Sequence, residues 1–193
     1  LIGLETGVLS GPDQVIPWDG TKQPFETWER DHTLASAIRF SAVPYFQQVA
    51  RRIGPERMER FLRDVGYGNA TVGPVINRFW LDGPLAISPV EQLGFLERLY
   101  TDRLPFAAKR QQTVRRLLVL EETPAGTLSG KAGSTYGSGR MPIGWFVGHV
   151  KMDRDGDGNA YVFAARITAS DHATGTAARR IASEILGRMG LLP

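Results

Sequence analysis

A serine in a helical stretch and a lysine in an extended one are the residues of this chain best suited to acyl transfer. Ser41 opens the run Ser41–Val43, and Lys131 lies between Gly130 and a second glycine, Gly133. A serine hydrolase that acts on an anionic amide needs a nucleophile, a proton shuttle and a cation for the substrate carboxylate. Ser41 could relay protons. The glycines would leave the Lys131 ammonium unobstructed and would let substrate lie flat against the strand edge.

Each candidate stretch also has a plainer interpretation. A serine within a helix is most often a surface residue or one bonded to the preceding turn. A lysine on an edge strand usually points into solvent. Tyr67–Asn69 follows a predicted helix end and would by itself be a helix-terminating turn. The chemistry is therefore predicted from the combination of these stretches and not from any one of them.

Metal and phosphate chemistry are not predicted. The acidic stretch Asp153–Gly158 begins like a calcium-binding loop, but the twelfth position, which requires a bidentate carboxylate, is Ala164. A polar hairpin turn explains this stretch better. The three histidines are dispersed and the chain has no cysteine, so we predict no metal site. The glycines of Ser134–Gly139 lack the Gly-Lys-Ser/Thr ending of a phosphate-binding loop.

Composition is typical of a soluble globular domain. The 193 residues are 42% hydrophobic and 22% charged, and the net charge is +3. The positive residues are scattered and form no tract with interleaved aromatics, so no nucleic-acid partner is predicted. No apolar run approaches the roughly 18 residues of a membrane span. The start, Leu1–Leu4, has neither an initiator methionine nor the features of a signal peptide. We therefore expect the chain to begin inside a domain.

Hydrophobic periodicity predicts helices first and strands afterwards. A short helix and an irregular loop are predicted in residues 1–30, and longer helices over 34–53 (interrupted at Pro44), 55–65, 88–99 and 107–118. Ser88–Glu91 is a capping box that starts the third of these longer helices. Strands are predicted over 127–132, 143–152 and 159–168, with a hairpin turn between the last two, and a closing helix over 177–189. We predict one mixed α/β domain over 1–193, with a helical region and an antiparallel sheet flanked by helices.

The candidate stretches belong to a longer ordered set of motifs, and with this set the sequence resembles the class D serine β-lactamases. Ser41–Val43 matches the Ser-x-Val motif of that family, and Tyr67–Asn69 matches its Tyr-Gly-Asn motif. Lys131–Gly133 occupies the position of its Lys-Thr/Ser-Gly motif. Three further matches complete the set: Trp28–His32 before the serine, Phe79–Gly83 followed by Ile87-Ser88 in the omega-loop region, and Gly144–Gly148 on the following strand.

The resemblance implies a serine β-lactamase/transpeptidase-like fold and a nucleophile in a Ser-x-x-Lys turn, whose lysine is carboxylated by carbon dioxide and acts as general base. No serine here has a lysine three residues later. In the family that turn lies just upstream of the segment that Leu1–Gly7 resembles. We therefore expect this chain to be the C-terminal four-fifths or so of the domain, without its N-terminal strands. By itself it should be inactive and prone to aggregate.

The resemblance also implies roles for individual residues. Ser41 would pass a proton to the leaving nitrogen, Lys131 would supply positive potential, and the indole N–H of Trp80 would hold the carbamate. Val43 and Leu81 would line the carbamate pocket. The residues expected to contact substrate on the other side of the site are Ala132, Gly133, Ser134 and Arg179. No metal and no cofactor beyond carbon dioxide are expected.

Three departures from the family pattern concern substrate binding. Ala132 replaces the usual hydroxyl residue, which removes one hydrogen bond to the substrate carboxylate. Ser134 stands where many members carry an aromatic residue. Ala178 occupies the usual position of the carboxylate-binding arginine, three residues before Ile181. Arg179 or Thr176 could take over that role, and the sequence leaves both open.

The function implied by the resemblance is hydrolysis of β-lactam antibiotics through an acyl-serine intermediate. A penicillin-sensing receptor domain, which is acylated but does not turn over, is the alternative, and a fragment without activity is a third. Tyr67–Asn69 and the strand with Trp145 favour the enzyme over the sensor. The partner is then a small-molecule β-lactam, a homodimer is compatible with the family, and the location is periplasmic or secreted.

Overall fold

The computed structural model describes residues 1–135, 141–153, 158–168 and 172–192. The chain divides into two compact units, the first made of Leu1–Ala86 and Pro105–Leu117, the second of Ile87–Leu104 and Leu118–Pro193. The single domain over 1–193 stays a prediction. Every described helix is too short or too polar to cross a bilayer.

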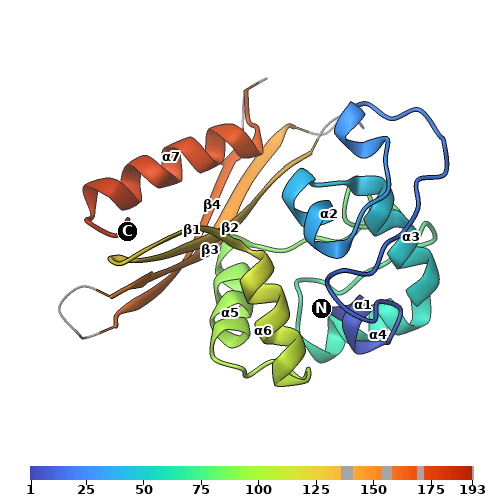
Figure 1. The fold of residues 1–193 in the computed structure, drawn as a ribbon, viewed down its shortest axis with the longest axis horizontal. Helices are drawn as coiled ribbons and strands as arrows, with labels where there is room; N and C mark the ends of the chain where they lie inside the picture. The colour runs from blue at the N-terminus through green and yellow to red at the C-terminus, as the bar shows by residue number, and fades with distance from the viewer. Residues whose placement is uncertain (136–140, 154–157, 169–171, 193) are drawn as a thin grey trace. The chain divides into compact units, whose positions relative to one another are not determined.

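The first unit is helical (Figure 1). Its elements are α1 (Ile2–Glu5), a 3-10 turn (Glu26–Trp28), α2 (Leu34–Phe40), α3 (Val43–Ile53), α4 (Pro55–Asp64) and α6 (Ala108–Leu117). The short first helix, the irregular loop after it and the helix starting at Pro55 are as predicted. The helices of this unit surround one core, which includes Leu34, Tyr45 and Val49 together with the loop residues Val72 and Phe79.

The predicted interruption of the helix over 34–53 lies just before Pro44 and not at it. Ser41 ends α2 in the left-handed conformation, with φ 51 and ψ 42. Pro44 lies in the first turn of α3. A proline is tolerated there because the N–H that it lacks would have no partner inside the helix. The break therefore comes from Ser41, and the proline starts the next helix.

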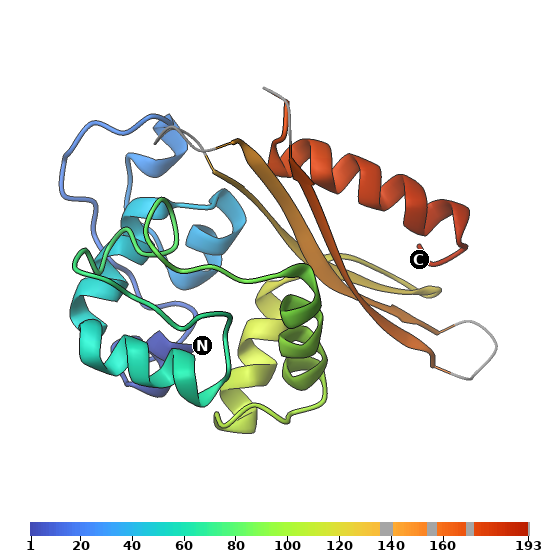
Figure 2. The same ribbon diagram turned by 180° about the vertical axis from the view of Figure 1, so that it is seen from behind.

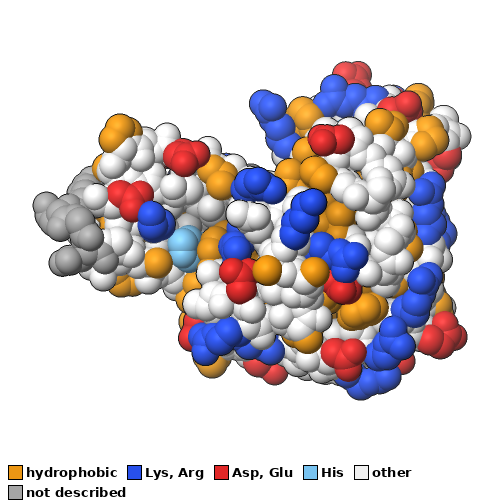
Figure 3. Space-filling view, turned by 60° about the horizontal axis from the view of Figure 1, so that its bottom comes forward, with side chains coloured by type: hydrophobic (Ala, Val, Ile, Leu, Met, Phe, Trp, Pro, Cys, Tyr) orange, Lys and Arg blue, Asp and Glu red, His pale blue; other side chains and the backbone are white. Residues whose placement is uncertain are grey.

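Helices α3 and α4 bury one side and expose arginines on the other. Arg51 and Arg52 end α3, Arg57 and Arg63 belong to α4, and all four are exposed. Positively charged side chains of this part of the chain form the blue groups on the right of Figure 3. This amphipathic pattern is the reason why periodicity predicted these helices well.

The second unit is an antiparallel sheet between two helices. Its elements are α5 (Pro89–Tyr100), β1 (Val119–Thr123), β2 (Gly126–Thr135), β3 (Ile143–Met152), β4 (Ala160–Thr168) and α7 (Gly175–Arg188), and the strand order is β1-β2-β3-β4. The capping box predicted at Ser88 is present, with the Ser88 hydroxyl accepting from the Glu91 N–H and the Glu91 carboxylate accepting from the Ser88 N–H. Of the hairpin turn predicted between the last two strands, residues 154–157 lie outside the described part. The mixed α/β prediction is confirmed.

The two faces of the sheet are covered by different helices (Figures 1 and 2). On the α7 face, Phe146 of β3 is fully buried with Ala178 and Ala182 of the helix. On the opposite face, the ring of Tyr100 in α5 stacks on His149 of β3, with 3.9 Å between ring centroids. The side chains of β3 thus point alternately to opposite faces of the sheet. This gives the strand a hydrophobic pattern with a period of two, from which it was predicted.

Candidate active site

Ser41 is held at the junction between α2 and α3. Its backbone N–H lies 3.3 Å from the Ile38 carbonyl, and the N–H of the fully buried Ala42 donates to the Ala37 carbonyl at 2.9 Å. The Trp28 indole N–H donates to the carbonyl of Phe40 at 3.0 Å. A left-handed conformation is uncommon for a residue with a side chain and persists only where its surroundings enforce it. These bonds enforce it at Ser41, which is therefore a helix-ending residue and not one inside a helix.

Two arginines that lie against the ring of Phe40 bring positive charge near this junction. The guanidinium of Arg30 lies 4.4 Å from the centroid of the Phe40 ring, and that of Arg39 lies 5.7 Å from it. Both arginines are exposed. Cations over an aromatic face are attracted by the ring quadrupole. The surface around Phe40, the residue before Ser41, thus carries positive charge.

His32 is a core residue. Its Nδ1 lies 2.9 Å from the Ser36 hydroxyl and its Nε2 lies 3.0 Å from the Thr27 carbonyl. With both ring nitrogens engaged by neutral groups, this histidine is not set up to bind a metal. Across the described residues, no cluster of three or more histidines, cysteines and carboxylates could hold a metal ion.

The loop that carries Trp80 has a tightly bonded tip. The Arg78 carbonyl accepts hydrogen bonds from the N–H groups of Leu81, Asp82 and Gly83. The Arg78 side chain forms an ion pair with Asp82. Trp80 lies within this turn, half-buried, with its ring edge-on to Phe79 at 5.0 Å. The turn therefore fixes the backbone on both sides of the indole.

The loop tip is fastened to α3. The Gln47 side-chain amide donates to the Asn77 carbonyl at 3.1 Å. Residues four apart share one face of a helix, so Gln47 and Val43 lie on the same side of α3. The predicted pocket residues Val43, Trp80 and Leu81 thus belong to one face of α3 and to the loop tip attached to that face. Among the described residues, none accepts a hydrogen bond from the Trp80 indole.

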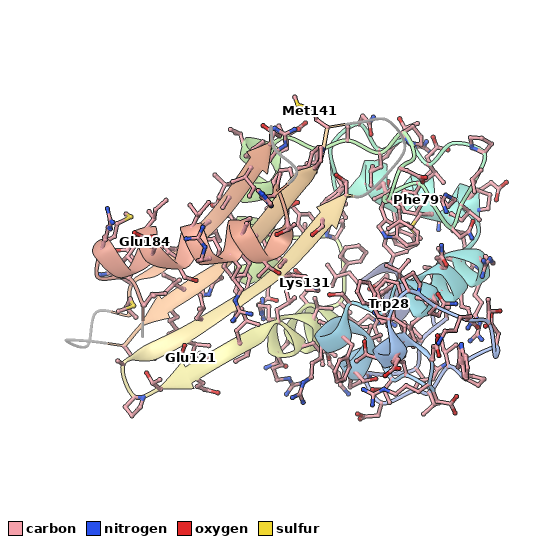
Figure 4. All side chains as sticks on the ribbon, turned by 90° about the horizontal axis from the view of Figure 1, so that it is seen from above. Trp28, Phe79, Glu121, Lys131, Met141 and Glu184 are labelled. Atoms are coloured by element: carbon pink, nitrogen blue, oxygen red, sulfur yellow. The ribbon has the colours of Figure 1, made fainter. Side chains whose placement is uncertain are left out.

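Lys131 is half-buried on β2 (Figure 4). Its ammonium donates to the Ala132 carbonyl at 2.6 Å. Burial lowers the pKa of Lys131 because it disfavours the charged form, and the positive charge of Arg179 lowers that pKa further. An amine in these surroundings gains from a ligand that brings a negative charge.

The strand edge beside Lys131 has backbone groups directed outward. The register of β1 with β2 ends at Ser129, so from Lys131 onward β2 pairs, among the described strands, with β3 alone. The Gly130 N–H donates to the Leu118 carbonyl on the β1 side. Because N–H groups alternate along a strand, those of Ala132 and Ser134 also point to this side. This edge can pair with an extended ligand as an added strand would.

Glycines bring the start of α7 against the same strand. A Cβ atom at Gly175 would lie 2.7 Å from the Gly133 carbonyl oxygen. The Ser134 hydroxyl accepts a hydrogen bond of 2.8 Å from the Gly175 N–H, which leaves its hydrogen for another partner. Gly133 is exposed, with open space where its own side chain would point.

The position of α7 distinguishes Ala178 from its neighbour. Ala178 is fully buried on the sheet face. The guanidinium of Arg179 lies 5.8 Å from the centroid of the Phe146 ring, and Phe146 pairs with Ala132 across the strands. The charge of Arg179 acts on Lys131. Both alternatives to the missing arginine are exposed, and Arg179 is the one whose charge acts on Lys131.

The predicted site residues thus fall into two groups. The first unit holds Ser41, Val43, Trp80 and Leu81, and the second holds Lys131, Ala132, Gly133, Ser134 and Arg179. The roles of these residues, and the convergence of the two groups, stay predictions. Gln47 and Gly175 were not predicted to contribute. The sequence held a signal for Gln47, which lies four residues after Val43 and so on the same face of the helix. A signal for Gly175 was its place directly after Thr174, whose hydroxyl caps α7.

Comparisons with known proteins agree with the resemblance. The model of the penicillin binding protein transpeptidase domain matches residues 1–187. Probable beta-lactamase YbxI of Bacillus subtilis is 42% identical over 192 residues, covering 100% of this chain and 68% of that protein. Regulatory protein BlaR1 of Bacillus licheniformis is 36% identical over 193 residues, but these are 31% of its length. The crystal structure of the class D β-lactamase YbXI from Nostoc has a TM-score of 0.92 and 39% identity, covering 100% of this chain and 79% of that one.

Proposed function

This chain belongs to the penicillin binding protein transpeptidase domain family, with class D β-lactamases among its relatives, and we propose that it is the larger part of an enzyme that hydrolyses β-lactam antibiotics. The observation that carries this proposal is the edge of β2. There the Lys131 ammonium lies beside outward-directed backbone groups of Ala132 and Ser134, with the charge of Arg179 close by. A β-lactam offers a carboxylate, which the positive charges can bind, and amide groups, which the backbone groups can bind.

Substrate would be bound through its carboxylate by Lys131 and Arg179. Ala132 has no hydroxyl, which costs a hydrogen bond to a charged group, worth about 1.5–3 kcal/mol. Arg179 would offset part of this loss. The outward N–H groups of the strand edge would donate to substrate carbonyl oxygens, and fixed donors of this kind stabilise charge that develops during acyl transfer.

Ser41 would move the proton in acylation. As the lactam C–N bond breaks, the leaving nitrogen needs a proton, and a hydroxyl held at a fixed junction is suited to deliver it. The acylated serine and the lysine general base would come from a Ser-x-x-Lys turn that this chain does not contain. The positive charges of Arg30 and Arg39 beside Ser41 would favour approach of the anionic substrate.

Carbon dioxide would modify that lysine, and the resulting carbamate would act as the base for deacylation. The residues present fit such a group, because the loop tip offers a half-buried indole whose N–H is not engaged by a described residue, and Gln47 attaches this tip to the face of α3 that carries Val43. Val43 and Leu81 would keep water from the amine, since a neutral amine is required for carboxylation. Trp80 would donate its N–H to a carbamate oxygen. By the same family argument we expect a periplasmic or secreted protein.

The alternative is a penicillin sensor, which is supported by the similarity to BlaR1. Both functions begin with acylation of serine and differ in deacylation. The complete protein should be mixed with a molar excess of benzylpenicillin, with hydrolysis followed by absorbance and the adduct by intact-mass spectrometry. The enzyme should consume many equivalents with a transient adduct. A single equivalent and a lasting adduct would support the sensor, and neither adduct nor turnover would contradict both.

A further inference from the structure

Asn69 closes the loop that carries Trp80. Its backbone N–H donates to the Ala86 carbonyl at 3.0 Å. Its side-chain oxygen accepts from the Ala86 N–H at 3.0 Å, and its side-chain nitrogen donates to the Pro84 carbonyl at 2.8 Å. Compact loops of this kind are defined by ends that lie close together. Here one side chain joins the two ends.

The bonding pattern requires an amide at this position. The Asn69 oxygen accepts from both the Ala86 and the Thr71 N–H groups, the latter at 3.3 Å, while its nitrogen donates. Only an amide side chain is donor and acceptor at once in this arrangement. An aspartate would keep the accepting oxygen but would face the Pro84 carbonyl with a second oxygen. An alanine would lose all the side-chain bonds.

The two arms of the loop also touch each other between Asn69 and the tip. A Cβ atom at Gly73 would lie 2.8 Å from Cγ of Pro84, and φ at Gly73 is +68. The tip itself is held by the Gln47 bond to the Asn77 carbonyl. The segment from 70 to 85, which carries Trp80, is therefore fixed at both its base and its tip, and Trp80 also packs against the core of this unit.

We infer that Asn69 is a positioning residue, which closes this loop so that the Trp80 indole N–H stays directed at the lysine carbamate. The inference rests on the proposed function. It assigns to Asn69 a role through Trp80 and no contact with substrate. When the base of the loop opens, the indole samples more orientations, the carbamate loses its donor, and the lysine returns more often to the free amine.

The test uses the complete protein with Asn69→Ala and Asn69→Asp, and with Asn77→Ala as the matched control. The control removes an amide of the same loop whose side chain bonds to none of the described residues. Each variant is assayed for kcat with and without added bicarbonate, and the carbamate is measured by carbon-13 NMR after labelling with carbon-13 bicarbonate. The readouts thus report on the carbamate itself and not only on folding.

We expect Asn69→Ala to lower kcat at least roughly tenfold in air, with a weaker carbamate signal and recovery of most of the rate in bicarbonate. Asn69→Asp should give a smaller loss of the same kind, and it decides the question if the alanine variant does not fold. Asn77→Ala should match wild type. A full carbamate signal in both Asn69 variants, or a loss that bicarbonate does not relieve, overturns the inference. Wild type without hydrolysis or carbamate would instead refute the proposed function.

Discussion

At the scale of single residues, the proposed binding of substrate depends on the charge of Lys131. Two positive groups act on each other: Lys131, which is half-buried on β2, and Arg179, which is exposed on α7. The two positive charges repel each other, and a bound carboxylate would relieve that repulsion. The proposed binding energy would therefore include the removal of an unfavourable interaction. Burial, and after it the neighbouring charge, lowers the pKa of Lys131 and so narrows the pH range in which it remains an ammonium.

The activity of the complete protein should fall at alkaline pH. A neutral Lys131 cannot attract the substrate carboxylate. Because the pKa of Lys131 is lowered, kcat/KM should begin to decline at a pH below about 10.4, the ordinary pKa of lysine. Arg179→Ala removes one cause of the lowering and should move the decline to higher pH. Arg180→Ala, an exposed neighbour, is the control. A pH–rate profile that does not respond to Arg179→Ala, or responds equally to Arg180→Ala, would contradict this assignment.

Trp80 should matter for deacylation through its N–H and not through its bulk. Trp80→Phe keeps an aromatic ring against Phe79 but has no donor, whereas Trp80→Ala loses both. Both variants should prolong the lifetime of the acyl adduct at least roughly tenfold, with partial recovery in bicarbonate. The lifetime is read by intact-mass spectrometry after a brief exposure to penicillin. A wild-type lifetime in Trp80→Phe would mean that the indole N–H has no part in the reaction.

At the scale of elements, the close approach of α7 to β2 positions Arg179. Gly175 contacts the Gly133 backbone, and Arg179 follows one helical turn later. The helix start is held by the Thr174 cap and by the Ser134 hydroxyl. A shift of this end of α7 would move the guanidinium away from the strand.

Gly175→Ala should therefore impair both stability and substrate binding. Its Cβ would lie 2.7 Å from a backbone atom, and such overpacking costs about 1–3 kcal/mol. Gly187→Ala is the matched control in the same helix, because its Cβ would meet Leu192 at an ordinary 3.5 Å. Urea unfolding and KM of the complete protein are the measurements. The prediction is wrong if Gly175→Ala is as stable as Gly187→Ala and keeps the wild-type KM.

Elements with a regular pattern were predictable from the sequence, and contacts between distant residues were not. The helix at Pro55 and the strand over 143–152 appear where periodicity placed them. β1 was missed because four of its five residues are exposed, which leaves no alternation to detect. The Gly175 approach to Gly133 and the Asn69 bonds to Pro84 and Ala86 join residues far apart in the chain, and no local rule predicts them.

At the scale of the whole molecule, the proposed site draws on both compact units. Ser41 and Trp80 belong to the first unit, and Lys131 and Arg179 to the second. The chain passes from one unit to the other at Ala86, Leu104 and Leu117. Neither unit contains both the proposed proton shuttle and the proposed carboxylate site. The proposed activity would therefore need groups from both units, and this has a measurable consequence.

Ser41 and Lys131 should be energetically coupled in the complete protein. If both groups serve one acyl-transfer step, each change to alanine removes most of what the pair contributes, and the double variant should lose far less than the product of the single losses. Each single loss in kcat/KM is expected to be about a hundredfold or more. Steady-state kinetics of the two single variants and the double variant measure the coupling.

The control cycle pairs Ser41→Ala with Lys151→Ala. Lys151 lies on β3, is exposed, and forms an ion pair with Asp153 at 2.6 Å, so its loss should add independently to that of Ser41. We expect the losses in kcat/KM to multiply in the control cycle. For Ser41 and Lys131 the double variant should lose much less than the product of the single losses, because the two groups act in the same transition state. If the losses multiply in both cycles, the hydroxyl and the ammonium act at separate places, and the assignment of both groups to one active site is wrong.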